Sequence, residues 1–228
     1  MNWFTSLPTN RLIAEYSLWS ADLINLSADL ERINLHADIL HIDVADGHFA
    51  PAMLFFPDLV TAIKRKTHIP IHVHLMVHND ILLDQAKQFV EAGADLISVH
   101  VENGEAIEPT FDYLDSVNTR KGMVLRVESP IALAAPFIQR LDFLTLLGTA
   151  IGVKGQNLNE AAGARLVEAK KLINSAQKEN RIVLAADGGI RENTVPLLRA
   201  QGAETVVLGS LAFGAADLGA RMSWLKSL

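Results

Sequence analysis

The chain has 228 residues, of which half are hydrophobic and a fifth are charged, and its formal net charge is −6 at pH 7. The negative charge and the lack of a lysine- and arginine-rich run argue against nucleic acid and a membrane surface as partners. There are no cysteines, so a metal site must use histidine and carboxylate ligands. No signal peptide precedes residue 10 and no apolar run approaches the roughly 18 residues of a membrane span, so we expect a cytoplasmic protein.

Short apolar runs alternate with segments of helical spacing along the whole chain. The runs are typical of parallel strands covered on both faces, and they lie at 12–19, 39–45, 71–77, 96–101, 122–127, 143–148, 181–187 and 205–210. The segments that predict helices lie at 22–33, 57–67, 81–92, 110–118, 130–139, 160–178, 193–200 and 215–226. This alternation favours an α/β fold closed into a (β/α)₈ TIM barrel. No linker interrupts it, so residues 1–228 are predicted to form a single domain.

Polar residues stand at the ends of three predicted strands, inside otherwise apolar runs. His41 and Asp43 end the second strand and share one face, because residues two apart in a strand point the same way. By the same parity His74 on the third strand points into the barrel, and Asp187 ends the seventh strand. The carboxyl ends of the strands carry the catalytic groups of this fold. We therefore expect these four side chains to converge.

Each of these residues also has an ordinary structural interpretation. A lone strand histidine is commonly a hydrogen-bonded core residue, and an aspartate before two glycines is commonly a turn former. Together they favour a metal site, because an apolar interior penalises polar groups without partners. Two imidazoles and two carboxylates suit one divalent ion, Zn²⁺, Mn²⁺, Fe²⁺ or Co²⁺. His72, on the inward face of His74, is predicted either to orient a ligand or to fill a polar core layer, and His100 to make a structural hydrogen bond.

Glycine-bearing turns follow the last two predicted strands, at 187–190 (Asp-Gly-Gly-Ile) and 209–210 (Gly-Ser). Backbone N–H groups at these strand ends form the usual phosphate site of a barrel, and glycine permits close approach of the phosphate oxygens. A third stretch, 152–156, either closes over the same phosphate through Lys154 or is an ordinary flexible loop.

Six motifs, spread from the first strand to the last, make the sequence resemble the ribulose-phosphate 3-epimerase family. The most specific of them is the stretch from His41 to Phe49, and the least specific is the Gly-Ser pair. The six are Ser17-Leu18-Trp19-Ser20-Ala21-Asp22, His41-Ile42-Asp43-Val44-Ala45-Asp46-Gly47-His48-Phe49, Val73-His74-Leu75-Met76, Val99-His100-Val101-Glu102, Asp187-Gly188-Gly189-Ile190 and Gly209-Ser210.

The resemblance implies a reaction and a role for each group of residues. It implies a metal-dependent epimerase that inverts C3 of a phosphorylated ketose, D-ribulose 5-phosphate giving D-xylulose 5-phosphate, through a metal-stabilised cis-enediolate. The expected roles are metal ligation by His41, Asp43, His74 and Asp187, acid and base catalysis by Asp43 and Asp187, substrate binding by Ser17, Met76, Gly152, Lys154 and Gly155, and phosphate binding by Gly188, Gly189, Gly209 and Ser210. The family also implies a homo-oligomer.

The sequence departs from the family pattern at several positions, most of them in the expected walls of the sugar site. They are Tyr16, Trp19, Ala45, His72, Leu147 and the loop 151–156. The expected acid, base and metal residues are intact. A related 3-epimerase acting on another ketose phosphate, such as allulose 6-phosphate, is therefore an alternative to the five-carbon substrate.

Two further alternatives belong to other functional classes. One is a non-catalytic sugar-phosphate-binding barrel, against which the retention of all four predicted metal ligands argues. The other is a decarboxylase of the orotidine-phosphate type, whose chemistry requires a lysine between aspartates at a strand end. The segment Asp43-Val44-Ala45-Asp46 has no such lysine.

Overall fold

The computed structural model describes residues 2–228, so Met1 of the predicted domain lies outside the described part. Eight parallel strands form the barrel, in which β1 pairs with β2 and so closes the ring. They are β1 (Ile13–Ser17), β2 (Ile39–Asp46), β4 (Ile71–Met76), β5 (Leu96–His100), β6 (Arg120–Leu125), β7 (Phe143–Leu147), β8 (Val183–Asp187) and β9 (Thr205–Leu208). The predicted (β/α)₈ barrel is confirmed, and a short antiparallel strand, β3 (Met53–Leu54), is added beside β2.

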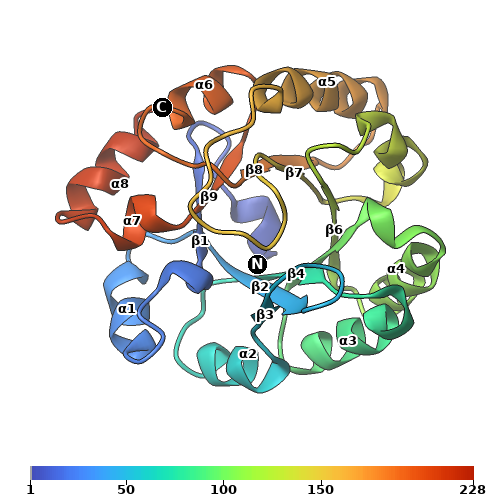
Figure 1. The fold of residues 1–228 in the computed structure, drawn as a ribbon, viewed down its shortest axis with the longest axis horizontal. Coiled ribbons are helices and arrows are strands. Elements are labelled where there is room, and N and C mark those ends of the chain that lie inside the picture. The colour runs from blue at the N-terminus through green and yellow to red at the C-terminus, as the bar shows by residue number, and fades with distance from the viewer. Residues whose placement is uncertain (1) are drawn as a thin grey trace.

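Helices surround the barrel on all sides (Figure 1). The α-helices are α1 (Leu26–Ile33), α2 (Pro57–Lys64), α3 (Asn79–Glu91), α4 (Ile107–Ser116), α5 (Ala162–Ser175), α6 (Val195–Ala200), α7 (Ser210–Phe213) and α8 (Leu218–Lys226). Four 3₁₀ segments complete the set: η1 (Trp3–Ser6), η2 (Leu18–Ser20), η3 (Val101–Ala106) and η4 (Ile131–Arg140). The helix expected at 130–139 is this 3₁₀ segment, since Pro136 has no N–H for an α-helical bond. None of the described helices has the length and apolarity to cross a membrane.

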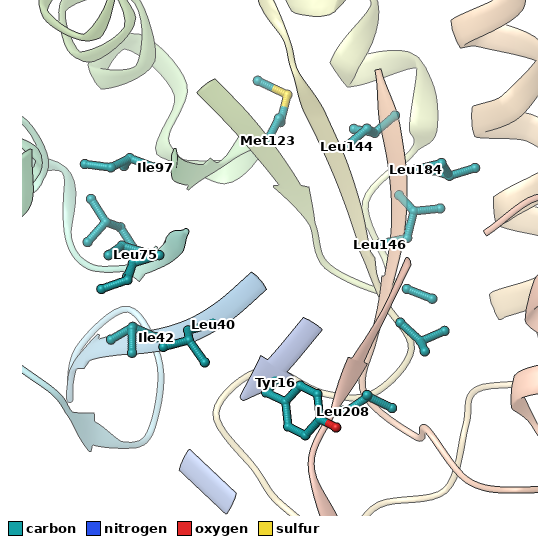
Figure 2. Packing of buried hydrophobic residues seen from close by; sticks show 14 of the residues in the cluster. Tyr16, Leu40, Ile42, Leu75, Ile97, Met123, Leu144, Leu146, Leu184 and Leu208 are labelled. Carbon is teal, nitrogen blue, oxygen red and sulfur yellow. The ribbon is translucent and has the colours of Figure 1, made fainter. Parts of the chain in front are cut away.

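The two faces of the strands divide the interior into an outer and an inner layer. Outward side chains such as Ile42, Leu75 and Leu144 are fully buried between strands and helices (Figure 2). Inside the barrel, the end at which the strands begin is filled by apolar residues, onto which Phe4 and Leu7 from the η1 region pack. A polar layer lies above this apolar base and includes Glu15, His41, His72, Ser98 and Thr205, all almost without exposure.

Glu102 joins the loop after β5 to the loop after β6. One carboxylate oxygen accepts a hydrogen bond from His100 Nδ1 at 2.9 Å, and the other accepts from the Arg126 backbone N–H at 3.1 Å and from the Ser129 hydroxyl. Burial would raise the pKa of Glu102, but the bonds from His100 and Ser129 outweigh it and hold the pKa at about 2. The ionised side chain therefore stabilises the end of the barrel at which the strands finish.

We expect Glu102→Gln to lower the free energy of unfolding by about 2 kcal/mol at pH 7, because charge-assisted bonds are lost. The folded-state pKa lies below the ordinary 4.5, so the stabilisation is present above that value and disappears as the pH falls towards 2. Denaturant unfolding at a series of pH values should show the two proteins converging in acid. Glu105→Gln, at an exposed position on the same segment, serves as the control. A difference that stays constant down to pH 2 would contradict the assignment.

Candidate active site

Four of the predicted site residues meet at the carboxyl ends of the strands. His41 and Asp43 come from β2, His74 from β4, where it is the register partner of Asp43, and Asp187 from the last position of β8. One ligand atom from each of the four lies within 4.8 Å of the others, so the group could hold a metal ion. Three of these residues are buried and Asp187 is partly exposed.

The arrangement leaves one buried nitrogen without a hydrogen bond. His74 Nδ1 has no partner among the described residues, although it lies 3.3 Å from Asp43 Oδ1 and 3.8 Å from Asp187 Oδ2. His41 Nε2 points to the same place and lies 3.2 Å from Asp43 Oδ1. An unpartnered buried nitrogen is costly, and a cation between these atoms would supply its missing partner. Two imidazole nitrogens and two carboxylates therefore fit a divalent first-row ion.

Burial and charge move the pKa values of the two aspartates in opposite directions. Burial favours neutral Asp43, but the charge of His41, a hydrogen bond from His41 and the charge of His74 together hold its pKa well below the usual range. For Asp187, burial is the main effect, and with the nearby charge of Asp43 it raises the pKa to about 6 against the opposing charge of His41. A bound divalent cation would favour the ionised form of both carboxyl groups.

In His41 and in His74, the ring nitrogen that faces away from the two aspartates contacts a further buried side chain. His41 Nδ1 lies 2.7 Å from Glu15 Oε1. His74 Nε2 lies 2.8 Å from His100 Nε2, and His100 Nδ1 in turn bonds Glu102. Burial lowers the pKa of His100 to about 4 despite its bond to Glu102, so this imidazole is neutral at pH 7. His100 thus makes a hydrogen bond, as predicted, and that bond orients His74.

A cavity of about 330 Å³ opens over these groups. Every predicted site residue except His41 lines it, namely Ser17, Asp43, His74, Met76, Gly152, Lys154, Gly155, Asp187, Gly188, Gly189, Gly209 and Ser210. Ser17 Oγ also donates to Asp43 Oδ2 at 2.8 Å. The wall includes the departures Trp19 and Leu147, while Ala45 packs with Met76 beside the cavity.

The glycines after β8 are required by packing as well as by access. Gly188 and Gly189 have φ values of 89° and 69°, which side chains rarely adopt. A Cβ at Gly188 would lie 2.3 Å from Thr149 Oγ1, and one at Gly189 would lie 2.7 Å from the Leu158 Cα. The turn therefore packs tightly against the loop after β7 and exposes its backbone to the cavity.

The loop after β7 reaches across the cavity to the loop after β1. The Lys154 ammonium donates to the Trp19 carbonyl oxygen and lies 4.7 Å from the centre of the Trp19 ring. Gly152, with φ of 70°, lies against the β2–β3 connection, where a Cβ would come within 3.0 Å of Ala50 and Pro51. Burial lowers the pKa of Lys154, with the charge of Asp43 opposing. The Lys154 ammonium group thus connects the loop after β7 with the loop after β1 across the cavity.

Two residues that the sequence analysis did not select belong to this region. Glu15 is fully buried behind His41, and its signal was a glutamate at the inward position of an apolar strand, two residues before Ser17. Arg191, two residues after Gly189, also lines the cavity, and its signal was that it is the first basic residue after the Gly-Gly turn. His72 contacts Glu15 and Ser98 and does not line the cavity.

The sequence matches the ribulose-phosphate 3 epimerase family over residues 13–213. It is 34% identical over 192 residues to the ribulose-phosphate 3-epimerase of Aquifex aeolicus, covering 84% of this chain and 85% of that one. It is 31% identical over 202 residues to the enzyme of the same name from Bacillus subtilis, covering 88% and 92% of the two chains.

Among solved structures, the fold is similar to 3-hexulose-6-phosphate synthase from Salmonella typhimurium, with a TM-score of 0.69 and 16% identity over 95% of this chain and 97% of that one. It is also similar to orotidine 5'-monophosphate decarboxylase from Methanocaldococcus jannaschii, with a TM-score of 0.68 and 14% identity over 95% and 98% of the chains. At these identities the likeness concerns the fold alone. The family match and the curated relatives carry the conclusion that this chain belongs to the ribulose-phosphate 3-epimerase family and is an isomerase, a sugar-phosphate epimerase.

Proposed function

We propose that the enzyme inverts C3 of a ketose phosphate by proton transfer between Asp43 and Asp187, with D-ribulose 5-phosphate converted to D-xylulose 5-phosphate. The supporting observation is that the two carboxylates enter one cavity from β2 and from β8, strands that β1 and β9 separate in the ring. A substrate lying between them presents one face of C3 to each. One carboxylate removes the C3 proton and the other returns a proton to the opposite face, so no net proton is consumed.

The proton on C3 is too weakly acidic for a free carboxylate to remove. A divalent ion held by His41, Asp43, His74 and Asp187 would polarise the adjacent carbonyl and stabilise the negative charge that develops. Ser17 fixes the position of Asp43 through a hydrogen bond to Oδ2 at 2.8 Å, and His41 Nε2 lies 3.2 Å from the other oxygen, Oδ1. Asp187 keeps 18% of its side chain exposed to the cavity.

The phosphate is proposed to lie on the turns after β8 and β9. Gly188, Gly189, Gly209 and Ser210 of these turns line the cavity, and Arg191, which also lines it, adds a positive charge. Lys154 approaches from the loop after β7 and would carry its charge over the sugar. Its bridge to Trp19 would be exchanged for contacts with the substrate when the cavity fills.

A six-carbon ketose phosphate of the allulose 6-phosphate type is the second candidate substrate. The observation in its favour is the composition of the wall, where the small Ala45 packs with Met76 and where Trp19 and Leu147 line the cavity. The walls select the length of the sugar, whereas the two aspartates act on C3 in both cases. A comparison of kcat/KM for the two ketose phosphates decides between the candidates.

Replacing either aspartate should abolish exchange of the C3 hydrogen. We expect Asp43→Asn and Asp187→Asn to slow incorporation of solvent deuterium at C3 by at least about 10²-fold, the usual contribution of one acid or base group. Mass spectrometry of ketose phosphate incubated in D₂O measures this rate. The purified parent should contain about one divalent ion per chain, lost or weakened in Asp43→Asn. Asp84→Asn, an exposed change on α3, is the control. If the unmutated protein contains no divalent metal and does not exchange the C3 hydrogen with solvent, the epimerase proposal is wrong.

Lys154 should contribute to binding more than to chemistry. We expect Lys154→Met to raise KM about tenfold and to change kcat little, because the cation contacts the bound sugar phosphate before and during the reaction alike. Steady-state kinetics with each ketose phosphate measures the two constants. Lys171→Met, exposed on α5, removes a lysine of the same length far from the cavity. An unchanged KM would show that the ammonium serves only its contacts with Trp19.

A further inference from the structure

Glu15 is a carboxylate sealed inside the barrel, below the site. Its side chain has no exposure, and Oε1 lies 2.7 Å from His41 Nδ1 and 2.5 Å from His72 Nδ1. The Thr205 hydroxyl donates to Oε2 over 3.3 Å. Removing an ion from water costs several kcal/mol unless hydrogen bonds surround it, and these three contacts supply them. The carboxylate is therefore an integral, hydrogen-bonded part of the polar layer.

The contacts of Glu15 determine which nitrogens carry protons. An ionised carboxylate only accepts hydrogen bonds, so His41 Nδ1 and His72 Nδ1 both donate to it. His72 Nε2 lies 2.6 Å from Ser98 Oγ, which donates in turn. For His41, the remaining nitrogen is Nε2, which faces Asp43 and the unpartnered Nδ1 of His74. Nε2 is thus the nitrogen of His41 that is directed at the cation position.

The neighbouring strands leave room for this arrangement. Gly122 on β6 is the register partner of Ser98 on β5. A Cβ at position 122 would lie 1.9 Å from Ser98 Oγ, so any other residue there would displace the hydroxyl that completes the network. Glycine at this position, in the middle of a buried strand, therefore leaves the space that the hydrogen-bonded chain from Glu15 through His72 to Ser98 requires.

We infer that Glu15 is a positioning residue that acts through His41. It holds the proton of His41 on Nδ1 and the ring in one orientation, so that Nε2 faces the divalent ion before that ion binds. The inference rests on the proposed function in taking the ion to lie among His41, Asp43, His74 and Asp187. Partners of this kind raise metal affinity by about 10- to 100-fold in other proteins. His74 receives its counterpart less directly, through His100.

The first test needs no variant at Glu15. In the parent protein loaded with Zn²⁺, long-range ¹H–¹⁵N NMR of the histidine rings should show His41 with a protonated Nδ1 and a zinc-bound Nε2. The His41 signals are assigned by their absence in His41→Asn. A zinc-bound Nδ1 with a protonated Nε2 would overturn the inference, whatever the activity of the enzyme.

The second test measures Zn²⁺ affinity by competition with a chelator. Glu15→Gln keeps the volume of the side chain and removes its charge, and we expect it to weaken Zn²⁺ binding at least tenfold. Thr205→Val is the matched control, because it removes the longest contact of Glu15 and touches no imidazole. Its affinity should stay within about twofold of the parent, a change worth less than about 0.5 kcal/mol.

The outcomes separate this inference from the proposed function. Parent-like affinity in folded Glu15→Gln, or an equal loss in Thr205→Val, would overturn the inference and leave the proposed function standing. A parent that binds no Zn²⁺, Mn²⁺, Fe²⁺ or Co²⁺ would overturn both. If Glu15→Gln does not fold, the NMR measurement on the parent decides the question alone.

Discussion

The cost of burying charge in the barrel interior governs this structure. Glu15, Asp43 and Asp187 lie inside a shell of apolar strands, where a carboxylate without partners would be strongly unfavourable. Each has a different compensation. Glu15 is surrounded by hydrogen-bond donors, and Asp43 has Ser17 and two imidazoles nearby. Asp187 is compensated least: burial and the charge of Asp43 raise its pKa to about 6, although the charge of His41 opposes them. A divalent cation held among these residues would relieve that incomplete compensation and give the unpartnered His74 nitrogen a partner.

The polar network has two arms that reach the site by different routes. On one side a carboxylate touches its imidazole directly, as Glu15 touches His41. On the other side a neutral imidazole intervenes, because His100 stands between His74 and Glu102. The second arm also connects with the loops after β5 and β6, whereas the first ends inside the barrel at Ser98 and Thr205. The orientation of His74 is therefore coupled to the structure of these loops, and that of His41 to residues inside the barrel.

Much of this arrangement could be predicted from the sequence, and the reasons for the remainder are physical. Alternation of apolar runs identified all eight barrel strands, and strand parity put His41, Asp43 and His74 on the inward face. The glycines after β8 were expected for phosphate access, but Thr149 and Leu158 also require them, and such contacts join positions about thirty or more residues apart in sequence. Glu15 was missed because its partners, His41, His72 and Thr205, come from three other strands. Pairing across a barrel depends on register, which periodicity does not reveal.

The apolar base formed by Phe4, Leu7 and the inner side chains below Glu15 fills the end of the barrel at which the strands begin. The cavity opens at the other end, among the loops that follow the strands. In the proposed reaction the substrate would enter and the product would leave through this opening, past the loop that carries Lys154. The two carboxylates differ in their access to that mouth, since 18% of the Asp187 side chain is exposed and 8% of the Asp43 side chain. Water meets one aspartate more readily than the other. In the proposed two-aspartate reaction, Asp187 would therefore exchange its proton with the solvent faster than Asp43.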